Sequence, residues 1–290
     1  GGMTAPIIDG LRAAARNLKL TWLLWAWYGL LAIVPAFPVW RWWNQVLGAS
    51  PEAAAILKRF DLGVFLDLTR SEGVGGLGLM SAAVGAAAGI AIVSSAFAFG
   101  GILEVVGAAD DHRPFMHRFF RGGGRFFWRF LRLGVMAAAG AVLATGLVSA
   151  LMTAVTRPLS ESEWEPGFYL AGALTVAAVL ISAALFLLAL DYARIRVARD
   201  DSRRMLRAYA AGMGFVLRRA RRVYSIAIAF VALEAAFVVG YLAYETNAPA
   251  AGTWGAIAAL VLVQQVVVVS RVFLRVAMVA AERSFYAAAV

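Results

Sequence analysis

Residues 203–222 read RRMLRAYAAGMGFVLRRARR and decide the fold class of this chain. The segment carries seven arginines and no acidic residue, and it lies between two apolar runs that are each long enough to cross a bilayer. Two further basic segments, at 116–132 and more faintly at 10–19, also precede apolar runs. We therefore expect basic amphipathic segments that lie on the cytoplasmic membrane surface and lead into membrane helices.

Composition places the chain among membrane proteins. Of its 290 residues 62% are hydrophobic and only 15% are charged, and the mean hydropathy is +0.77. Soluble domains hold about 45–50% apolar and about 25% charged residues, so lipid must be the solvent for much of this surface. The net charge of +10 is clustered beside the apolar runs, which favours anionic lipid over nucleic acid as the partner. The absence of cysteine excludes disulfides and thiolate chemistry.

Six apolar runs predict six membrane helices, at about 20–37, 76–106, 131–155, 167–190, 223–243 and 253–280. Pro35 and Pro38 are expected to end or kink the first of these helices. In the second helix Ser81, Gly85 and Gly89 recur every four residues, which predicts close packing against a neighbouring helix.

The distribution of lysine and arginine predicts the orientation in the membrane. If the N-terminus, both long basic segments and the C-terminal end share one side, that side holds 22 of the 27 cations. The positive-inside rule then places both termini in the cytoplasm, and we expect a multi-pass protein of the bacterial inner membrane. The longest stretch on the other side, at about 38–74, is expected to be an outer-face insertion with a helix that begins after Ser50.

The basic segments also indicate an internal repeat. Gly10, Gly123 and Gly212 are each followed at the same spacing by two cations that lie three residues apart. We interpret the chain as one all-α membrane domain over 1–290, built from three parallel hairpins with basic interfacial helices. The expected pseudo-repeats cover about 7–108, 114–198 and 203–285. Chance similarity between arginine-rich juxtamembrane segments is the alternative interpretation.

Arginines of the second and third basic segments are the candidate lipid- or phosphate-binding residues. Cations three residues apart share a helix face, and each contributes on the order of 1 kcal/mol near an anionic surface. One interpretation is a phospholipid or phosphate site where several segments converge, and the other is topological anchoring alone. The candidates are Arg118, Arg129, Arg132, Arg207, Arg218, Arg221 and Arg222.

Glu234 is an ionisable residue in the middle of a predicted span. A charge at this depth is costly unless it is protonated, paired or turned towards a cavity. Gln264 and Gln265 lie at similar depth on the next helix, so a hydrogen bond to Glu234 is the simplest arrangement. The alternative is a midplane site for proton- or cation-coupled transport.

The sequence contains no motif for catalysis or metal binding. His112 and His117 are the only histidines and lie among arginines, which disfavours a metal site. Asp191 and Glu104 stand at the inner ends of two predicted helices, and we expect them to pair with nearby arginines. We therefore predict no catalytic residue, no metal and no cofactor.

Residues 190–219, which read LDYARIRVARDDSRRMLRAYAAGMGFVLRR, resemble a feature of uncharacterised bacterial six-helix membrane proteins. Some of these are similar to the membrane region found beside glycerophosphodiester phosphodiesterases. The resemblance rests on the order Asp-Tyr-x-[Arg/Lys] followed by a basic amphipathic segment. It implies the six-helix topology and carries over no catalytic residue.

The expected function is that of a non-enzymatic inner-membrane protein that engages anionic phospholipids, as an organiser, an assembly factor or a lipid-handling partner. The alternative is a small transporter or permease subunit with a midplane site at Glu234. Anionic membrane lipids are the expected partners, a homo-oligomer or a partner membrane protein is left open, and no nucleic acid is expected.

Overall fold

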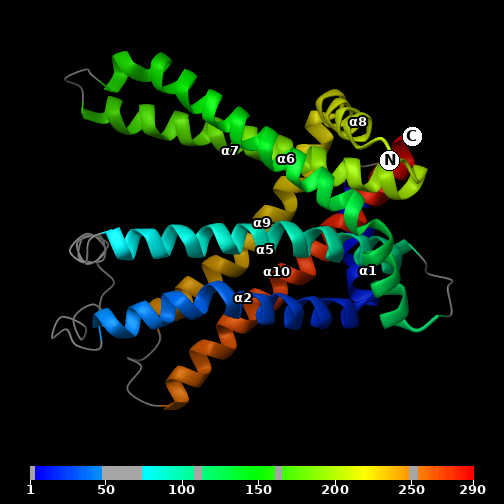
Figure 1. Ribbon diagram of the computed structural model, residues 1–290, viewed down its shortest axis with the longest axis horizontal. Coiled ribbons are helices and arrows are strands. Elements are labelled where there is room, and N and C mark those ends of the chain that lie inside the picture. Colours follow the sequence, from blue (N-terminus) through cyan, green and yellow to red (C-terminus); the bar gives the residue numbers. More distant parts are fainter. Residues whose placement is uncertain (1–3, 48–73, 108–112, 161–164, 248–253) are drawn as a thin grey trace. The chain divides into compact units, whose positions relative to one another are not determined.

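The computed structural model describes residues 4–47, 74–107, 113–160, 165–247 and 254–290. Within these ranges the chain forms eight helices and no strand, and six helices are long and apolar enough to cross a membrane (Figure 1). The expected all-α polytopic membrane fold is therefore confirmed. The predicted outer-face helix after Ser50 lies outside the described residues.

Two helices are short and six are long. The short helices are α1 (Thr4–Arg16) and α8 (Met205–Arg218). The long helices are α2 (Leu18–Leu47), α5 (Val74–Gly107), α6 (Phe115–Ser160), α7 (Glu165–Asp200), α9 (Ala220–Asn247) and α10 (Trp254–Ala289). Because α1 and α8 each directly precede a long helix, the first and third basic segments are separate helices, as expected.

Two predicted helix boundaries are wrong. Helix α2 does not end at its prolines but continues through Pro35 and Pro38 to Leu47. Continuing the helix through the two prolines costs one backbone hydrogen bond at each of them. Ending the helix there, within lipid, would leave several backbone groups without hydrogen bonds, which costs more free energy. The second basic segment is not a separate helix either, because α6 runs unbroken from Phe115 to Ser160.

A local break separates α8 from the long helix that follows it. Arg219 leaves the helical conformation, with φ −123° and ψ 26°, and α9 begins at the next residue. Its backbone N–H still donates to the carbonyls of Phe215 and Val216. The break lets α8 and α9 run in different directions (Figure 1).

The chain folds as two compact units. Unit 1 comprises Gly1–Trp22 with Ala96–Val290, and unit 2 comprises Leu23–Ser95. In the described part of unit 2, nothing lies within 4 Å of the position that a Cβ on Gly85 or Gly89 would take. Within this unit the close packing predicted for Gly85 and Gly89 is therefore not seen. The close contacts of α5 are made by its other end, which belongs to unit 1.

Glycines bring the basic segments of unit 1 against neighbouring helices. A Cβ on Gly212 of α8 would lie 2.7 Å from the carbonyl oxygen of Ala189 and 2.9 Å from the nitrogen of Ala193, both in α7. Gly10 of α1 lies in the same way against the carbonyl oxygen of Ala277 in α10. Since these neighbours are backbone atoms, any side chain would force the helices apart.

A third contact of this kind joins α6 to α5. A Cβ on Gly122 would lie 2.6 Å from the carbonyl oxygen of Gly100 and would also meet the side chain of Glu104. Gly122 thus makes a backbone contact like those of Gly10 and Gly212, and Gly123, which the sequence pattern selected, packs beside it, because its Cβ would lie 2.7 Å from the ring of Phe97 in α5. In unit 1 the first basic segment therefore packs on α10, the second on α5 and the third on α7. The second and third segments each pack on the long helix that precedes them in the chain, and the first packs on the last helix.

Candidate functional site

An ion pair between a buried aspartate and a partly exposed arginine joins α7 to α10 within unit 1. Arg275 donates to both carboxylate oxygens of Asp191, at 3.1 and 2.9 Å. Arg194 is almost fully buried, with one nitrogen 3.7 Å from Asp191, and its guanidinium lies 5.1 Å from the centre of the Phe99 ring. The expectation that Asp191 pairs with arginine is confirmed. Because Asp191 and Arg194 are buried, removal of the Asp191 carboxylate would leave a buried positive charge without this compensation and would destabilise the fold.

Glu282 of α10 lies beside this ion pair. Its side chain is buried, and within the described residues its carboxylate oxygens have no hydrogen-bond partner. The positive charge of Arg275 stabilises the ionised carboxylate of Glu282, whereas the negative charge of Asp191 destabilises it. On the neighbouring helix Glu104 attracts Arg283, so the second predicted acid also lies near an arginine.

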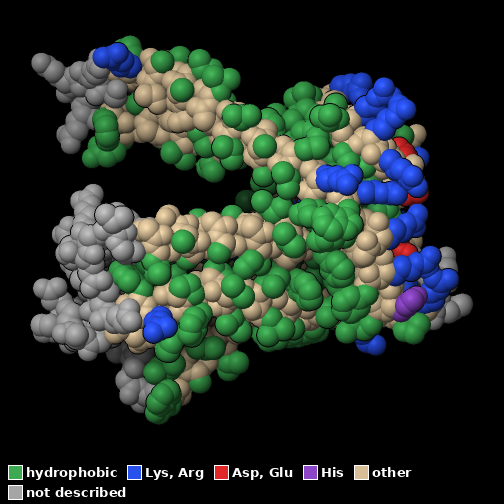
Figure 2. Space-filling view, in the orientation of Figure 1, with side chains coloured by type: hydrophobic (Ala, Val, Ile, Leu, Met, Phe, Trp, Pro, Cys, Tyr) green, Lys and Arg blue, Asp and Glu red, His purple; other side chains and the backbone are tan. Residues whose placement is uncertain are grey.

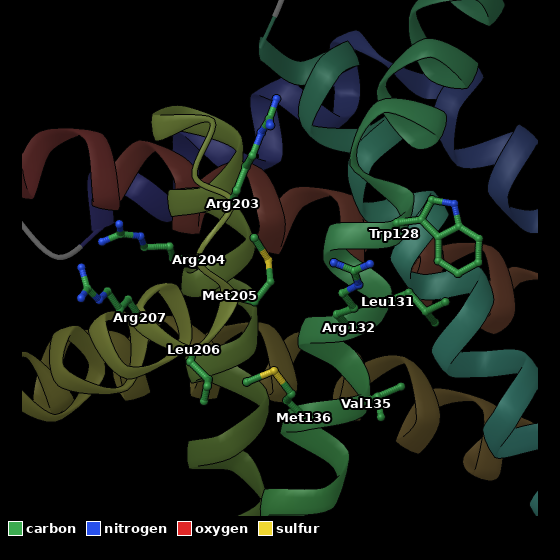
Figure 3. A pocket seen from close by; sticks show the side chains of 10 residues that line it. All are labelled: Trp128, Leu131, Arg132, Val135, Met136, Arg203, Arg204, Met205, Leu206 and Arg207. Carbon is green, nitrogen blue, oxygen red and sulfur yellow. The ribbon is translucent and has the colours of Figure 1, made fainter.

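Basic side chains gather at the end of unit 1 where α1 begins and α10 ends (Figure 2). Two grooves open there. Groove A, of about 780 Å³, lies between α6 and α8. It is lined by Trp128, Leu131, Arg132, Val135, Met136, Arg203, Arg204, Met205, Leu206 and Arg207 (Figure 3). Four arginines therefore share one groove with six apolar side chains.

The two sides of groove A come from basic segments about seventy residues apart in the chain. Arg132 stands on α6, and Arg204 and Arg207 stand at the beginning of α8. Within the described residues no carboxylate forms an ion pair with these three arginines. Helix α8 has no side-chain cap at its N-terminus, so its first backbone N–H groups add to the positive potential.

Asp201 fixes the turn that leads into groove A. Its carboxylate accepts a hydrogen bond from Arg129 of α6 and lies 3.6 Å from Arg125. The hydrogen bond and the charge of Arg129 hold the pKa of Asp201 below its usual value of 3.8. Arg129 was predicted to bind lipid, but its guanidinium is already paired with the Asp201 carboxylate.

Groove B, of about 690 Å³, lies where the start of α1 meets the α8–α9 junction and the end of α10. It is lined by Ala5, Pro6, Asp9, Arg218, Arg219, Ala220, Arg221, Arg222, Ile226, Ser284, Phe285, Ala288 and Ala289. Arg219 donates to the carbonyl oxygen of Ala289 at 2.8 Å and lies over the ring of Phe215, so it ties the α8–α9 junction to the end of α10.

The structure divides the predicted arginine set between these places. Arg132 and Arg207 face groove A, and Arg218, Arg221 and Arg222 line groove B. Arg118 lies on α6 and belongs to the lining of neither groove. The candidate residues predicted from the sequence did not include Arg203 and Arg204, although both belong to the basic stretch at 203–222. They also did not include Asp9, because one acid in a basic helix gives no signal until its neighbours are known.

Glu234 forms an ion pair that was not predicted from the sequence. Glu234 is on α9 and Arg271 is on the neighbouring α10. The Nε atom of Arg271 lies 3.0 Å from Oε1 of Glu234. Gln264 and Gln265, the predicted partners, lie on the same helix as Arg271. An opposite charge reduces the cost of a carboxylate at this depth without requiring a transported ion.

Within the described ranges there is no group of three or more metal-ligating side chains. Comparisons with family models, with curated proteins and with solved structures found no match to this chain. The two grooves and the charges that line them are therefore the features of this chain that bear on its function.

Proposed function

We propose that this multi-pass membrane protein engages anionic phospholipids at groove A, on the cytoplasmic side of the bacterial inner membrane. The observation that supports the proposal is the combination of Arg132, Arg204 and Arg207, all without a carboxylate partner in the described part of the chain, with a continuous apolar surface. A phospholipid carries in one molecule a phosphate that matches the arginines and acyl chains that match the apolar surface. No catalytic step is proposed.

The chemistry of the groove fits a lipid better than a free anion. Guanidinium groups bind phosphate oxygens through paired, charge-assisted hydrogen bonds. Below them Val135, Met136 and Leu206 offer an apolar path that an acyl chain can follow. Trp128 is 66% exposed at the edge of the groove, and tryptophan is the residue enriched at the headgroup level of membranes.

The membrane placement follows from the distribution of charge. The cations of both basic grooves belong to the side that the positive-inside rule assigns to the cytoplasm. That leaflet carries anionic lipid, to which each nearby arginine contributes on the order of 1 kcal/mol. Bound in this way, the protein acts as an organiser, an assembly factor or a lipid-handling partner in the inner membrane. Transport through a site at Glu234 stays a prediction that no specific observation favours.

Native mass spectrometry of the full chain with phosphatidylglycerol tests the proposal. The double variant Arg132→Gln/Arg207→Gln should bind this lipid roughly thirtyfold more weakly, since two contributions on the order of 1 kcal/mol are lost. Arg196→Gln is the matched control, because Arg196 pairs with Asp200 at 3.4 Å and lines neither groove. Equal binding by the double variant and the control would overturn the assignment of groove A.

A further inference from the structure

Groove B differs from groove A in carrying charges of both signs. Arg218, Arg221 and Arg222 come from the α8–α9 junction, and Asp9 comes from the facing end of α1. Groove A has four arginines and no acid in its lining. The two grooves therefore match ligands with different charge patterns.

The grooves occupy equivalent places in the repeated structure. Groove A lies where the basic segment of α6 meets the start of α8, and groove B lies where the α8–α9 junction meets the start of α1. Arg132 and Met136 of groove A correspond to Arg222 and Ile226 of groove B, 90 residues later in the chain. The correspondence indicates one type of binding position that occurs twice, with different residues on one side of the groove.

The side that differs is the one that carries Asp9. Its carboxylate is exposed, and it forms no ion pair or hydrogen bond with any residue in the described ranges. Arg221 and Arg222 are also exposed and have no acidic partner among those residues. Opposite charges that line one groove without meeting leave separate positions for the two ends of a ligand that carries both charges.

We infer that groove B binds a zwitterionic aminophospholipid. Its phosphate lies against Arg221 and Arg222, and its ammonium group donates hydrogen bonds to Asp9. A primary ammonium has three N–H donors, so ethanolamine satisfies the carboxylate, whereas the trimethylated choline group has none to offer. The inference rests on the proposed function in assigning phospholipid to the basic grooves, and it adds a second headgroup class at a second place.

The remaining lining of groove B suits the lipid body. Ile226 and Phe285 are buried apolar residues at its base, and Ala288 and Ala289 extend the surface along α10. The fixed contact from Arg219 to Ala289 holds this part of the groove together. Head and tail of one phospholipid thus have complementary surfaces within a single groove.

The test is native mass spectrometry of the full chain in an equimolar mixture of phosphatidylethanolamine, phosphatidylglycerol and phosphatidylcholine. The variant Asp9→Asn should retain about tenfold less phosphatidylethanolamine, with phosphatidylglycerol retained at the level of the unaltered chain. Asp9→Glu keeps the charge and should keep the ethanolamine lipid. Asp200→Asn is the matched control, because it removes an acid at the same end of unit 1 outside groove B.

The outcomes separate this inference from the proposed function. Unchanged phosphatidylethanolamine binding in Asp9→Asn, or an equal fall of all three lipids, overturns the inference. Loss of phosphatidylglycerol in Arg132→Gln/Arg207→Gln alone supports groove A independently of that result. Conversely, an ethanolamine effect of Asp9→Asn without any effect of the arginine double variant supports groove B and rejects groove A. Circular dichroism and thermal unfolding check that each variant is folded.

Discussion

Arg129 of α6 donates a hydrogen bond to Asp201, 72 residues later in the chain. Arg125 lies 3.6 Å from the same carboxylate, which therefore joins the basic segment of α6 to the turn before α8. Asp201 has φ 45°, a conformation that residues other than glycine, asparagine and aspartate rarely adopt. Because this turn leads directly into α8, the contact sets how far Arg132 stands from Arg204 across groove A.

Replacing Asp201 should loosen groove A with little loss of fold. Asp201→Asn keeps a side chain that tolerates the positive φ but removes the charge that holds Arg129. We expect phosphatidylglycerol binding to weaken by about two- to fivefold, while the unfolding temperature changes little, as is usual for exposed sites. Native mass spectrometry and thermal unfolding measure the two effects.

The same carboxylate gives a pH dependence of defined sign. The pKa of Asp201 is lower in the folded chain than its usual value of 3.8, so the contact stabilises the fold fully above that value. Its contribution is lost as the pH falls below 3.8, towards the folded-state pKa. A comparison of Asp201→Asn with the unaltered chain should show unfolding temperatures that converge only in this acidic range. A difference that grows on acidification would contradict the assignment.

Gly212→Ala should be strongly destabilising. The new methyl group would meet backbone atoms of Ala189 and Ala193 at 2.7 and 2.9 Å, so α8 must move away from α7. Overpacking of this kind typically costs about 1–3 kcal/mol. Gly214→Ala in the same helix is the control, because the nearest atom is the end of Arg218 at 3.6 Å. That change should be neutral or stabilise α8 by up to about 1 kcal/mol, through helix propensity.

Arg271→Gln should destabilise the protein more than the double variant with Glu234→Gln. The single change leaves a carboxylate in a membrane span without its partner 3.0 Å away, at a cost of roughly 2–3 kcal/mol. Unfolding in bicelles measures the difference. Additive effects would indicate that the two residues do not interact.

Glu234→Gln also tests the transport alternative, since unaltered flux in reconstituted vesicles would reject a role for this carboxylate.

Asp191→Asn should be among the most damaging single changes. It leaves Arg194 buried and Arg275 partly buried without their shared carboxylate, which costs about 3 kcal/mol or more. Asp200→Asn removes a carboxylate from the exposed pair with Arg196 and should cost less than about 1 kcal/mol. Chemical denaturation in detergent distinguishes the two. Similar losses would mean that the buried pair has no special weight.

Single cysteines test the orientation, because the chain contains none of its own. Arg204→Cys lies at the start of α8 and should resist a membrane-impermeant thiol reagent until the cells are permeabilised. Glu245→Cys lies at the opposite end of α9 and should react in intact cells. Labelling of Arg204→Cys from outside would reverse the topology and move both grooves to the other face.

The sequence predicted the six crossing helices because hydropathy over about twenty residues is a local property. It also predicted the basic segments, and it placed Asp191 beside arginine from its position at a helix end. It selected Gly123, which packs on Phe97, but it did not indicate the backbone contact of Gly122, since the spacing of cations fixes a helix face only to within one residue. It predicted that Pro35 and Pro38 end or kink the first helix, whereas α2 continues to Leu47, because local propensity does not include the cost of open backbone groups in lipid.

The amino-acid sequence by itself determined that the chain is all-α, that it crosses a membrane and where its positive charge is concentrated. Only the tertiary structure decided that Glu234 meets Arg271, that Arg129 is taken up by Asp201, and that Asp9 shares a groove with Arg221 and Arg222. Hydrophobic runs and charge clusters act through neighbouring residues along the chain. The pairing of residues far apart depends instead on the rotation and register of packed helices, which the close glycine contacts set.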